Sequence, residues 1–394
     1  MHIPKLLAPV RNETSLTSAI KAGADAVYFG VGELNMRVSS RGIEPHELPR
    51  LVKFAHKNGV EVFITLNSII YDEEITKLKK ILTVIKKSQA DAVICHDMAV
   101  ITLCREMKIP IHLSTQANIS NTKSAQYYEK LGAKCVVLAR ECTLAQIAKI
   151  KKNVKCKVEI FGHGAMCVSV SGRCFLSEFL NCKSANRGEC TQPCRREYTI
   201  KDNEEYGNEL LVGGGYVMSP KDLCTIRILD KIAKTKIDYL KIEGRSRSPE
   251  YIATVTQTYR TALDALKNKK YTPELCDELI LDLQKVYNRG FSEGFLFGRP
   301  ASEGWVRGRD NQATERKEFV GKISHYYPKA GVAELFCQAG KLKTGEEIYI
   351  QGPTTGSLRL KIEKLEKHEN NLATFPCAEY VRLNDEVYKI VKIK

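Results

Sequence analysis

One pattern repeats through the first two-thirds of the chain: a short β-branched run, a polar turn, and a helix with an apolar period of about 3.6 residues. Eight such runs are candidate strands, at residues 5–10, 26–31, 60–66, 92–95, 111–114, 135–139, 158–161 and 239–242. Helices are predicted between them, at residues 14–21, 47–57, 73–87, 99–107, 122–131 and 144–152. Parallel strands with helical crossovers predict an α/β fold, a TIM-like (β/α)8 barrel.

Polar side chains follow nearly every candidate strand directly. Active sites of such barrels lie at the carboxyl ends of the strands, so we expect many of these side chains to share one pocket. The alternative for each side chain is to form a hydrogen bond within a local turn or to pair with a neighbouring charge. Glu243 with Arg245 or Lys241 is an example. The residues are Asn35, Arg37, Asn67, His96, Asp97, Gln116, Arg140, Glu141, His163, Glu243 and Arg245.

Cysteines gather after the seventh predicted strand. Of 14 in the chain, five lie between residues 159 and 198, and a sixth follows in Ser219-Pro-Lys-Asp-Leu-Cys. They are Cys167, Cys174, Cys182, Cys190, Cys194 and Cys224. Residues seven or four apart lie on one face of a helix. Cys167 with Cys174, and Cys190 with Cys194, therefore each suit shared ligation of one centre.

An iron–sulfur cluster suits this segment better than zinc. The chain has no Cys-x-x-Cys knuckle, and His163 is the only histidine nearby. A cluster held by four thiolates is negative, and Arg173, Arg187 and Arg195 would offset that charge. Structural thiols, zinc ligands of unusual spacing and disulfides are the alternatives. Disulfides are the weakest of these, because we expect no signal peptide before the first strand.

Charge and hydropathy limit the kinds of partner that the chain is expected to bind. The 394 residues include 61 Lys and Arg against 46 Asp and Glu, a net charge of +15. This excess suits a polyanion such as RNA, although lysine-rich helix faces account for part of it. The longest apolar runs, such as residues 60–70, fall short of the roughly 18 residues that span a membrane. We therefore expect a cytoplasmic protein that does not enter the membrane.

The chain is expected to divide into a barrel domain at residues 1–270, a helical linker at 271–317 and a C-terminal domain at 318–394. The first holds the cysteine-rich insertion, residues 164–224, and the linker begins after a helix at 248–267. Within the insertion a hairpin is predicted at residues 205–218, and Cys224 is expected to open the helix before the eighth strand. From residue 319 short alternating strands with glycine turns predict a small closed β-barrel. Basic residues before it, Arg307, Arg309, Arg316 and Lys317, would hold RNA or brace the first domain.

Several motifs carry a resemblance to peptidase family U32. They are Tyr28-Phe-Gly, Leu34-Asn-Met-Arg37, Gly164-Ala-Met-Cys, Ser171-Gly-Arg-Cys-Phe-Leu-Ser, Asn186-Arg-Gly-Glu-Cys-Thr-Gln-Pro-Cys-Arg, Ser219-Pro-Lys-Asp-Leu-Cys and Leu240-Lys-Ile-Glu-Gly-Arg. The C-terminal strands also resemble the second-domain barrel of translation GTPases. Despite the family's name, the resemblance implies oxygen-independent hydroxylation with a [4Fe-4S] cluster, and prephenate as a small-molecule requirement of the RNA-modifying branches.

The resemblance also implies the ligands. Cys167, Cys174 and Cys190 match positions used in the family, whose members differ over the fourth. Our prediction is Cys224, with Cys194 as the alternative. Cys182 does not match the motif.

The activity that we predict is hydroxylation of a tRNA wobble uridine to 5-hydroxyuridine. His163, Glu243, Arg245, Arg140 and Asn67 are the candidate catalytic residues, and tRNA, iron–sulfur assembly proteins and a related U32 chain are the candidate partners. The alternatives are hydroxylation of an rRNA cytidine or of a quinone ring, and peptidase activity. No nucleophile elbow or His-Glu-x-x-His motif supports a peptidase.

Overall fold

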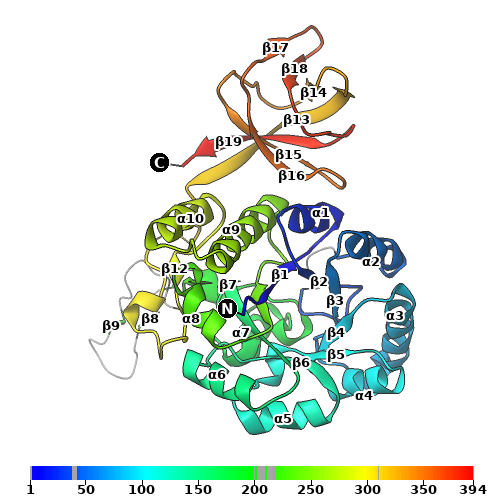
Figure 1. Ribbon diagram of the computed structural model, residues 1–394, viewed down its shortest axis with the longest axis vertical. Coiled ribbons are helices and arrows are strands. Elements are labelled where there is room, and N and C mark those ends of the chain that lie inside the picture. The colour runs from blue at the N-terminus through cyan, green and yellow to red at the C-terminus, as the bar shows by residue number, and fades with distance from the viewer. Residues whose placement is uncertain are drawn as a thin grey trace.

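The computed structural model describes residues 2–37, 42–198, 218–308 and 310–393, together with residues 200–201, 209–210 and 216. Eight parallel strands form a closed ring in chain order, because the last of them, β11, pairs with both β7 and β1 (Figure 1). The strands are β1 (Lys5–Pro9), β2 (Ala26–Gly30), β3 (Glu61–Thr65), β4 (Ala92–Cys95), β5 (Ile111–Leu113), β6 (Ala133–Val137), β7 (Lys157–Gly164) and β11 (Tyr239–Ile242). The predicted TIM-like barrel is confirmed.

Helices surround this ring. They are α1 (Glu13–Lys21), α2 (Leu48–Lys57), α3 (Ile75–Ser88), α4 (Met98–Glu106), α5 (Thr122–Lys130), α6 (Leu144–Lys152), α8 (Leu229–Lys234), α9 (Pro249–Lys267) and α10 (Pro273–Lys285). Side chains that the sequence supplies cap their first turns: Asn12 accepts a hydrogen bond from Ser15 N, and Thr143 one from Gln146 N. Single 3-10 turns lie at Pro45–Glu47, Asp72–Glu74, Thr115–Ala117, Val170–Gly172, Ala185–Arg187, Pro193–Arg195, Ile226–Ile228 and Ser302–Gly304.

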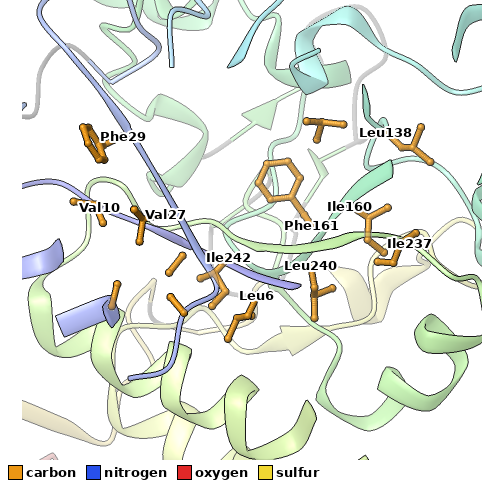
Figure 2. Packing of buried hydrophobic residues seen from close by; sticks show 14 of the residues in the cluster. Leu6, Val10, Val27, Phe29, Leu138, Ile160, Phe161, Ile237, Leu240 and Ile242 are labelled. Atoms are coloured by element: carbon orange, nitrogen blue, oxygen red, sulfur yellow. The ribbon is translucent and has the colours of Figure 1, made fainter. Parts of the chain in front are cut away.

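Successive side chains along each strand point to opposite faces of the sheet, which produces two apolar layers. Leu6, Val27, Leu240 and Ile242 belong to the larger cluster between the strands and the helices (Figure 2). A smaller cluster with Leu7, Tyr28, Phe63 and Tyr239 fills the inside of the barrel. Each fully buried leucine or isoleucine contributes about 1.5–3 kcal/mol to stability, so the outer layer holds the helices firmly on the ring.

The cysteine segment, residues 165–198, follows β7 and contains one helix, α7 (Leu176–Asn181). After a two-stranded pair, β8 (Ile200–Lys201) and β9 (Glu209–Leu210), the chain returns to the barrel as β10 (Asp222–Cys224). β10 runs antiparallel to the end of β7, with Cys224 opposite His163, and β12 (Phe291–Ser292) pairs with it on the other side.

This return corrects one expectation. We predicted that Cys224 would open the helix before the eighth strand, whereas it ends strand β10 because β7 continues to Gly164 and offers it a pairing edge. The hairpin predicted at residues 205–218 lies largely outside the described residues.

The C-terminal region is an antiparallel sheet in the order β16-β15-β19-β13-β14-β18-β17. Its strands are β13 (Glu315–Tyr327), β14 (Val332–Cys337), β15 (Glu347–Gly352), β16 (Gly356–Lys361), β17 (Glu366–Lys367), β18 (Leu372–Pro376) and β19 (Glu386–Lys392). Val320, Leu335, Ile350, Phe375 and Val387 belong to its separate core. Over the described residues the end strands β16 and β17 are not paired with each other, so the predicted closure is not observed in the hydrogen-bond ladder.

This sheet sits against the outside of the barrel, with β16 beside α1 and α9 (Figure 1). Thr17 Oγ1 donates to the carbonyl of Pro353 at 2.6 Å. Glu250 accepts hydrogen bonds from Lys317 Nζ at 3.0 Å and from Gln351 Nε2 at 2.9 Å. Among the described residues, the helices are all too short or too polar to cross a membrane.

Candidate functional site

A cavity of about 440 Å³ opens at the carboxyl ends of the barrel strands, between the ring and the cysteine segment. Inward-pointing residues of several strands line it from below: Tyr28, Thr65, Ile94, Val137, Phe161 and Lys241. The other wall consists of residues from the cysteine segment. The cavity therefore lies where a barrel of this type places its active site.

Glu243, just past β11, is the centre of charge of the cavity. Its Oε1 accepts from Arg37 at 3.2 Å, its Oε2 accepts from the hydroxyl of Tyr28 at 3.3 Å, and Arg140 lies 4.0 Å away. Burial on its own would raise the pKa of Glu243, but Arg37, Arg140 and Arg245 lower it to about 2. The carboxylate is thus ionised at neutral pH, so it accepts hydrogen bonds but is a weak proton acceptor.

Arg245 is buried beside it. One of its terminal nitrogens donates to Thr65 Oγ1 and to Asn35 Oδ1, and its guanidinium lies over the ring of Tyr28 at 5.8 Å. Burial lowers its pKa to about 10, so the group still carries its charge at neutral pH. Its Nε is buried and has no hydrogen-bond partner among the described residues, which leaves one donor available.

Arg140 and Asn67 complete the predicted catalytic residues that reach the cavity. The guanidinium of Arg140 stacks on Phe161 at 3.7 Å and donates to the carbonyl of Ala165. The amide of Asn67 accepts from Met36 N at 3.2 Å and donates to Gln116 Oε1 at 3.4 Å. Both side chains are therefore held in place by hydrogen bonds from neighbouring strand ends.

A charged pair lies directly below the cavity. Lys241 Nζ donates to Glu159 Oε1 at 2.6 Å and lies 4.1 Å from the centre of the Tyr28 ring. Glu159, His112 and Cys135 place their ligand atoms within 4.8 Å of one another, a possible metal-binding group. Lys241 already supplies the countercharge of Glu159, so we assign this trio to the polar core of the barrel.

Four cysteines of the segment line the cavity: Cys167, Cys174, Cys190 and Cys194. All four are free thiols. Cys174 Sγ accepts from Leu176 N at 3.4 Å, and Cys190 Sγ accepts from Ser177 Oγ at 3.9 Å. Burial raises the pKa of the Cys194 thiol, and Arg195 opposes this while the other three thiols add to it.

Glycine and one left-handed turn make this arrangement sterically possible. Gly164 has φ +104, and a Cβ there would lie 2.4 Å from the carbonyl oxygen of Glu243. Only glycine therefore lets the start of the segment pass over the end of β11. Gln192, with φ +55, adopts the left-handed conformation immediately before Pro193, and Cys190 and Cys194 on either side of this turn line the same cavity.

Cys224 and His163 lie elsewhere. Neither is among the residues that line the cavity. The thiol of Cys224 is buried and accepts from the hydroxyl of Tyr259 at 3.8 Å, and the same hydroxyl lies 3.3 Å from His163 Nδ1. Burial lowers the pKa of His163 to about 3. These two side chains therefore face helix α9, behind the barrel wall, and Cys182 is exposed at the end of α7.

The three arginines that were predicted to offset the negative charge of a cluster have different surroundings. Arg195 lines the cavity and ties the segment to its return strand, donating to Ser219 Oγ at 2.9 Å and to the carbonyl of Pro220 at 2.7 Å. Arg173 donates to the carbonyl of Gln116 at 3.0 Å. Arg187 pairs with Glu74 and lies over the ring of Tyr71 at 4.8 Å. Of the three, only Arg195 lines the cavity.

Most residues predicted from their position after a strand do reach the cavity: Arg37, Asn67, Gln116, Arg140, Glu141, Glu243 and Arg245 line it, whereas Asn35, His96, Asp97 and His163 do not. Sequence reasoning did not assign Tyr28, Lys241, Arg247 or Arg289 to the cavity, although all four line it. A signal existed for Lys241, because a lysine inside an apolar strand requires a buried partner.

The cysteine-lined wall is compatible with an iron–sulfur cluster. Four free thiols on one cavity wall are the donor set that a [4Fe-4S] cluster requires. The Leu176 amide and the Ser177 hydroxyl already donate to two of the sulfurs, which is how proteins tune such ligands.

Fold and site together define a (β/α)8-barrel protein with a charged, cysteine-lined cavity at its mouth. The model of peptidase family U32 matches residues 11–305, and the chain belongs to this family. It is 38% identical to a protein named collagenase from Porphyromonas gingivalis, over 98% of each chain. It is 33% identical to tRNA hydroxylation protein P1 of Bacillus subtilis, over 93% of this chain and 88% of that one. A 23S rRNA 5-hydroxycytidine synthase of Escherichia coli is 32% identical over 77% of this chain and 47% of its own length.

Proposed function

We propose that this protein is an iron–sulfur-dependent RNA hydroxylase that forms 5-hydroxyuridine at the wobble position of tRNA. The observation that carries the proposal is that four free cysteines and the three arginines around Glu243 line one cavity. We call these arginines, Arg37, Arg140 and Arg245, together with Glu243, the floor of the cavity. The relatives named for tRNA hydroxylation and rRNA hydroxycytidine synthesis support RNA as the substrate class. An enzyme with this substrate would act in the cytoplasm, where iron–sulfur assembly proteins would load it.

Cys167, Cys174, Cys190 and Cys194 would hold the cluster. The sequence prediction favoured Cys224 as the fourth ligand, but geometry favours Cys194, which shares the cavity with the other three. Cys224 would have to leave its contact with Tyr259 and move around β7. When bound, such a cluster supplies one-electron redox chemistry next to the floor of the cavity.

The protein's own residues would bind and orient the base. A uridine must leave its stack to enter a barrel mouth, as other base-modifying enzymes require. The amides of Asn67 and Gln116 offer both donors and acceptors to the edge of a uracil ring. Glu243 stays ionised, so it is suited to accepting a hydrogen bond from the target.

The arginines of the floor would hold a small anion. Arg37, Arg140 and Arg245 surround a single carboxylate, Glu243, which leaves positive charge in excess. Arg245 Nε is a buried donor with no partner among the described residues. Guanidinium groups bind carboxylates in a fork geometry, so a dicarboxylate such as prephenate suits this floor.

Peptidase activity has less support from the geometry. None of the described residues that line the cavity is a histidine, so among them Cys167 has no imidazole base. The cysteine that a peptidase would use as nucleophile is also one of the proposed cluster ligands.

The first test is anaerobic purification followed by iron and sulfide analysis with visible and EPR spectra. We expect about four irons per chain, their loss in Cys194→Ser, and their retention in Cys224→Ser. Cys182→Ser is the matched control, because that thiol is exposed and outside the cavity. Zinc, or no metal under strict anaerobic handling, would overturn the cluster.

The substrate is tested by quantifying modified nucleosides in a deletion strain. Loss of 5-hydroxyuridine from tRNA, restored by the wild-type gene but not by Cys174→Ser, is the expected result. Loss of hydroxycytidine from rRNA instead would move the target to the ribosome. Unchanged RNA together with lost collagen or peptide cleavage would establish the peptidase alternative.

A further inference from the structure

Exposed apolar side chains concentrate on the cysteine segment. Phe179 is 83% exposed, the largest value among the exposed large apolar residues that the structure describes, and Phe175 is 65% exposed. Val170 at 60% and Leu180 at 55% lie within the same eleven residues. Soluble proteins rarely leave such a group uncovered without a binding role.

Helix α7 has one side on the cavity and one side in solvent. Leu176 and Ser177 line the cavity, and Ser177 Oγ donates to the sulfur of Cys190. Phe175 and Phe179, four positions apart, point away, with ring centroids 6.3 Å apart and planes at 50°. The two rings therefore lie on the solvent side of a helix that borders the cavity. We call Phe175 and Phe179 the rim platform.

Charge around the rim platform favours a polyanion. Residues 165–198 contain five basic side chains against three acidic ones. Arg173 and Lys183, on either side of α7 in the sequence, are exposed. Arg187 holds Tyr71, itself 55% exposed, near the same segment by stacking on its ring. Aromatic rings interleaved with basic side chains are the surface that single-stranded nucleic acids bind.

We propose that the rim platform stacks unpaired nucleobases of the RNA loop whose target base enters the cavity. This inference rests on the proposed function and identifies how the substrate is held. Neighbours of a flipped base lose their stacking partner, and Phe175 and Phe179 would replace it. The rim platform would bind unpaired bases without preference for sequence, because every base has a π-face that can stack. Selectivity would come from the cavity.

The test measures binding of a tRNA transcript to the anaerobically purified full chain by fluorescence anisotropy. Phe179→Ala and the double variant with Phe175→Ala should weaken binding by about tenfold for each stacked base lost. Phe179→Trp should restore it, because indole stacks as well. Tyr127→Ala on α5, also an exposed aromatic on a helix, is the control and should leave the affinity unchanged.

Two further readouts keep the outcomes distinct. Iron content and melting temperature should stay at the wild-type level in the Phe179→Ala variant, since the ring makes no contact with the cavity. Wild-type affinity in the double variant would overturn the platform while leaving the hydroxylase intact. Self-association of the wild-type chain that the double variant loses without any loss of RNA affinity would also overturn it, in favour of a protein interface. Failure of the wild-type chain to bind RNA would overturn both proposals.

Discussion

At the scale of single residues, the cavity depends on Glu243. This one carboxylate is the partner of Arg37, lies within reach of Arg140 and accepts from Tyr28. Its position after β11 was predictable, because the carboxyl ends of barrel strands converge. That three arginines from different strand ends would meet around it was not predictable, since their side-chain directions depend on local loops.

Replacing Glu243 by Gln should lower stability at neutral pH and flatten its pH dependence. Because the pKa of Glu243 is about 2 in the folded protein and about 4.3 in an unfolded chain, its contribution is present above about pH 4.5. It is lost as the pH falls toward about 2. We expect the variant to lose roughly 3–5 kcal/mol at pH 7, the usual effect of removing one partner of a buried ion pair, and less at pH 3.

Urea unfolding of the wild type and the Glu243→Gln variant between pH 3 and 7 measures this difference. Glu106→Gln is the control, because Glu106 is exposed on α4. A difference between the two proteins that stays constant from pH 7 to pH 3 would contradict the assignment.

His163 illustrates the limit of prediction at this scale. It follows the seventh predicted strand, like the residues that do line the cavity, yet it points to Tyr259 on α9. The pairing of β7 with β11 shifts register between Lys241 and Ile242, opposite residues 161–163. Such a bulge turns the next side chain to the other face of the sheet, and no sequence pattern marked it.

At the scale of elements, the cysteine segment is held at its return by a buried ion pair. Arg289, just before β12, lies 3.5 Å from Asp222 of β10, and its Nε donates to Asp310 at 2.7 Å. Both Arg289 and Asp222 are buried. Burial raises the pKa of Asp222, and the Arg289 guanidinium opposes this shift. The pair therefore keeps the strand that closes the segment against the barrel.

Replacing Arg289 by Met should destabilise the protein by roughly 3–5 kcal/mol, because it removes the strongest of the positive charges that offset the burial of the Asp222 carboxylate. Adding Asp222→Asn should recover part of the loss. Arg316→Met is the matched control, since Arg316 pairs with Glu318 on the surface and should cost at most about 1 kcal/mol. Denaturant unfolding measures all three, and equal stability of the Arg289 and Arg316 variants would contradict the role of the pair.

At the scale of the whole molecule, two cores are joined where β16 packs beside α1 and α9, and a polar cluster forms part of this contact. The barrel and the C-terminal sheet each have a hydrophobic core of their own. Glu250 of α9 accepts hydrogen bonds from Lys317 and Gln351 of the sheet. The pKa of Glu250, which burial would raise, is lowered by Lys317, Ser248 and Gln351, so its carboxylate is ionised at neutral pH. The charge of Glu250 therefore contributes to the contact between the two parts.

Replacing Glu250 by Ala should loosen the sheet from the barrel at a cost of about 1–3 kcal/mol, because Lys317 and Gln351 lose their acceptor. We expect faster tryptic cleavage around residues 299–317 and a broader calorimetric transition as the two cores unfold separately. Glu278→Ala, an exposed residue on α10, is the control. An unchanged cleavage rate in the Glu250 variant would show that apolar packing alone holds the sheet.

The order of elements was accessible from the chain alone. Ala92–Cys95 and Tyr239–Ile242 were predicted with their bounds unchanged, and the other barrel strands moved by at most three residues at an end. The reason is local: a buried parallel strand needs a short β-branched run, and its crossover helix needs an apolar stripe. Such requirements are met by residues close together in the sequence.

The tertiary structure determines which cysteines line the cavity and which charged side chains pair with each other. The sequence prediction favoured Cys224 over Cys194, but the antiparallel pairing of β10 with β7 places Cys224 behind the wall, while Cys194 lines the cavity. Likewise Lys241 is neutralised by Glu159, a residue 82 positions away. These choices depend on which segments meet in space, and the strand pairings and turns that bring them together are long-range contacts that leave no periodic signal along the chain.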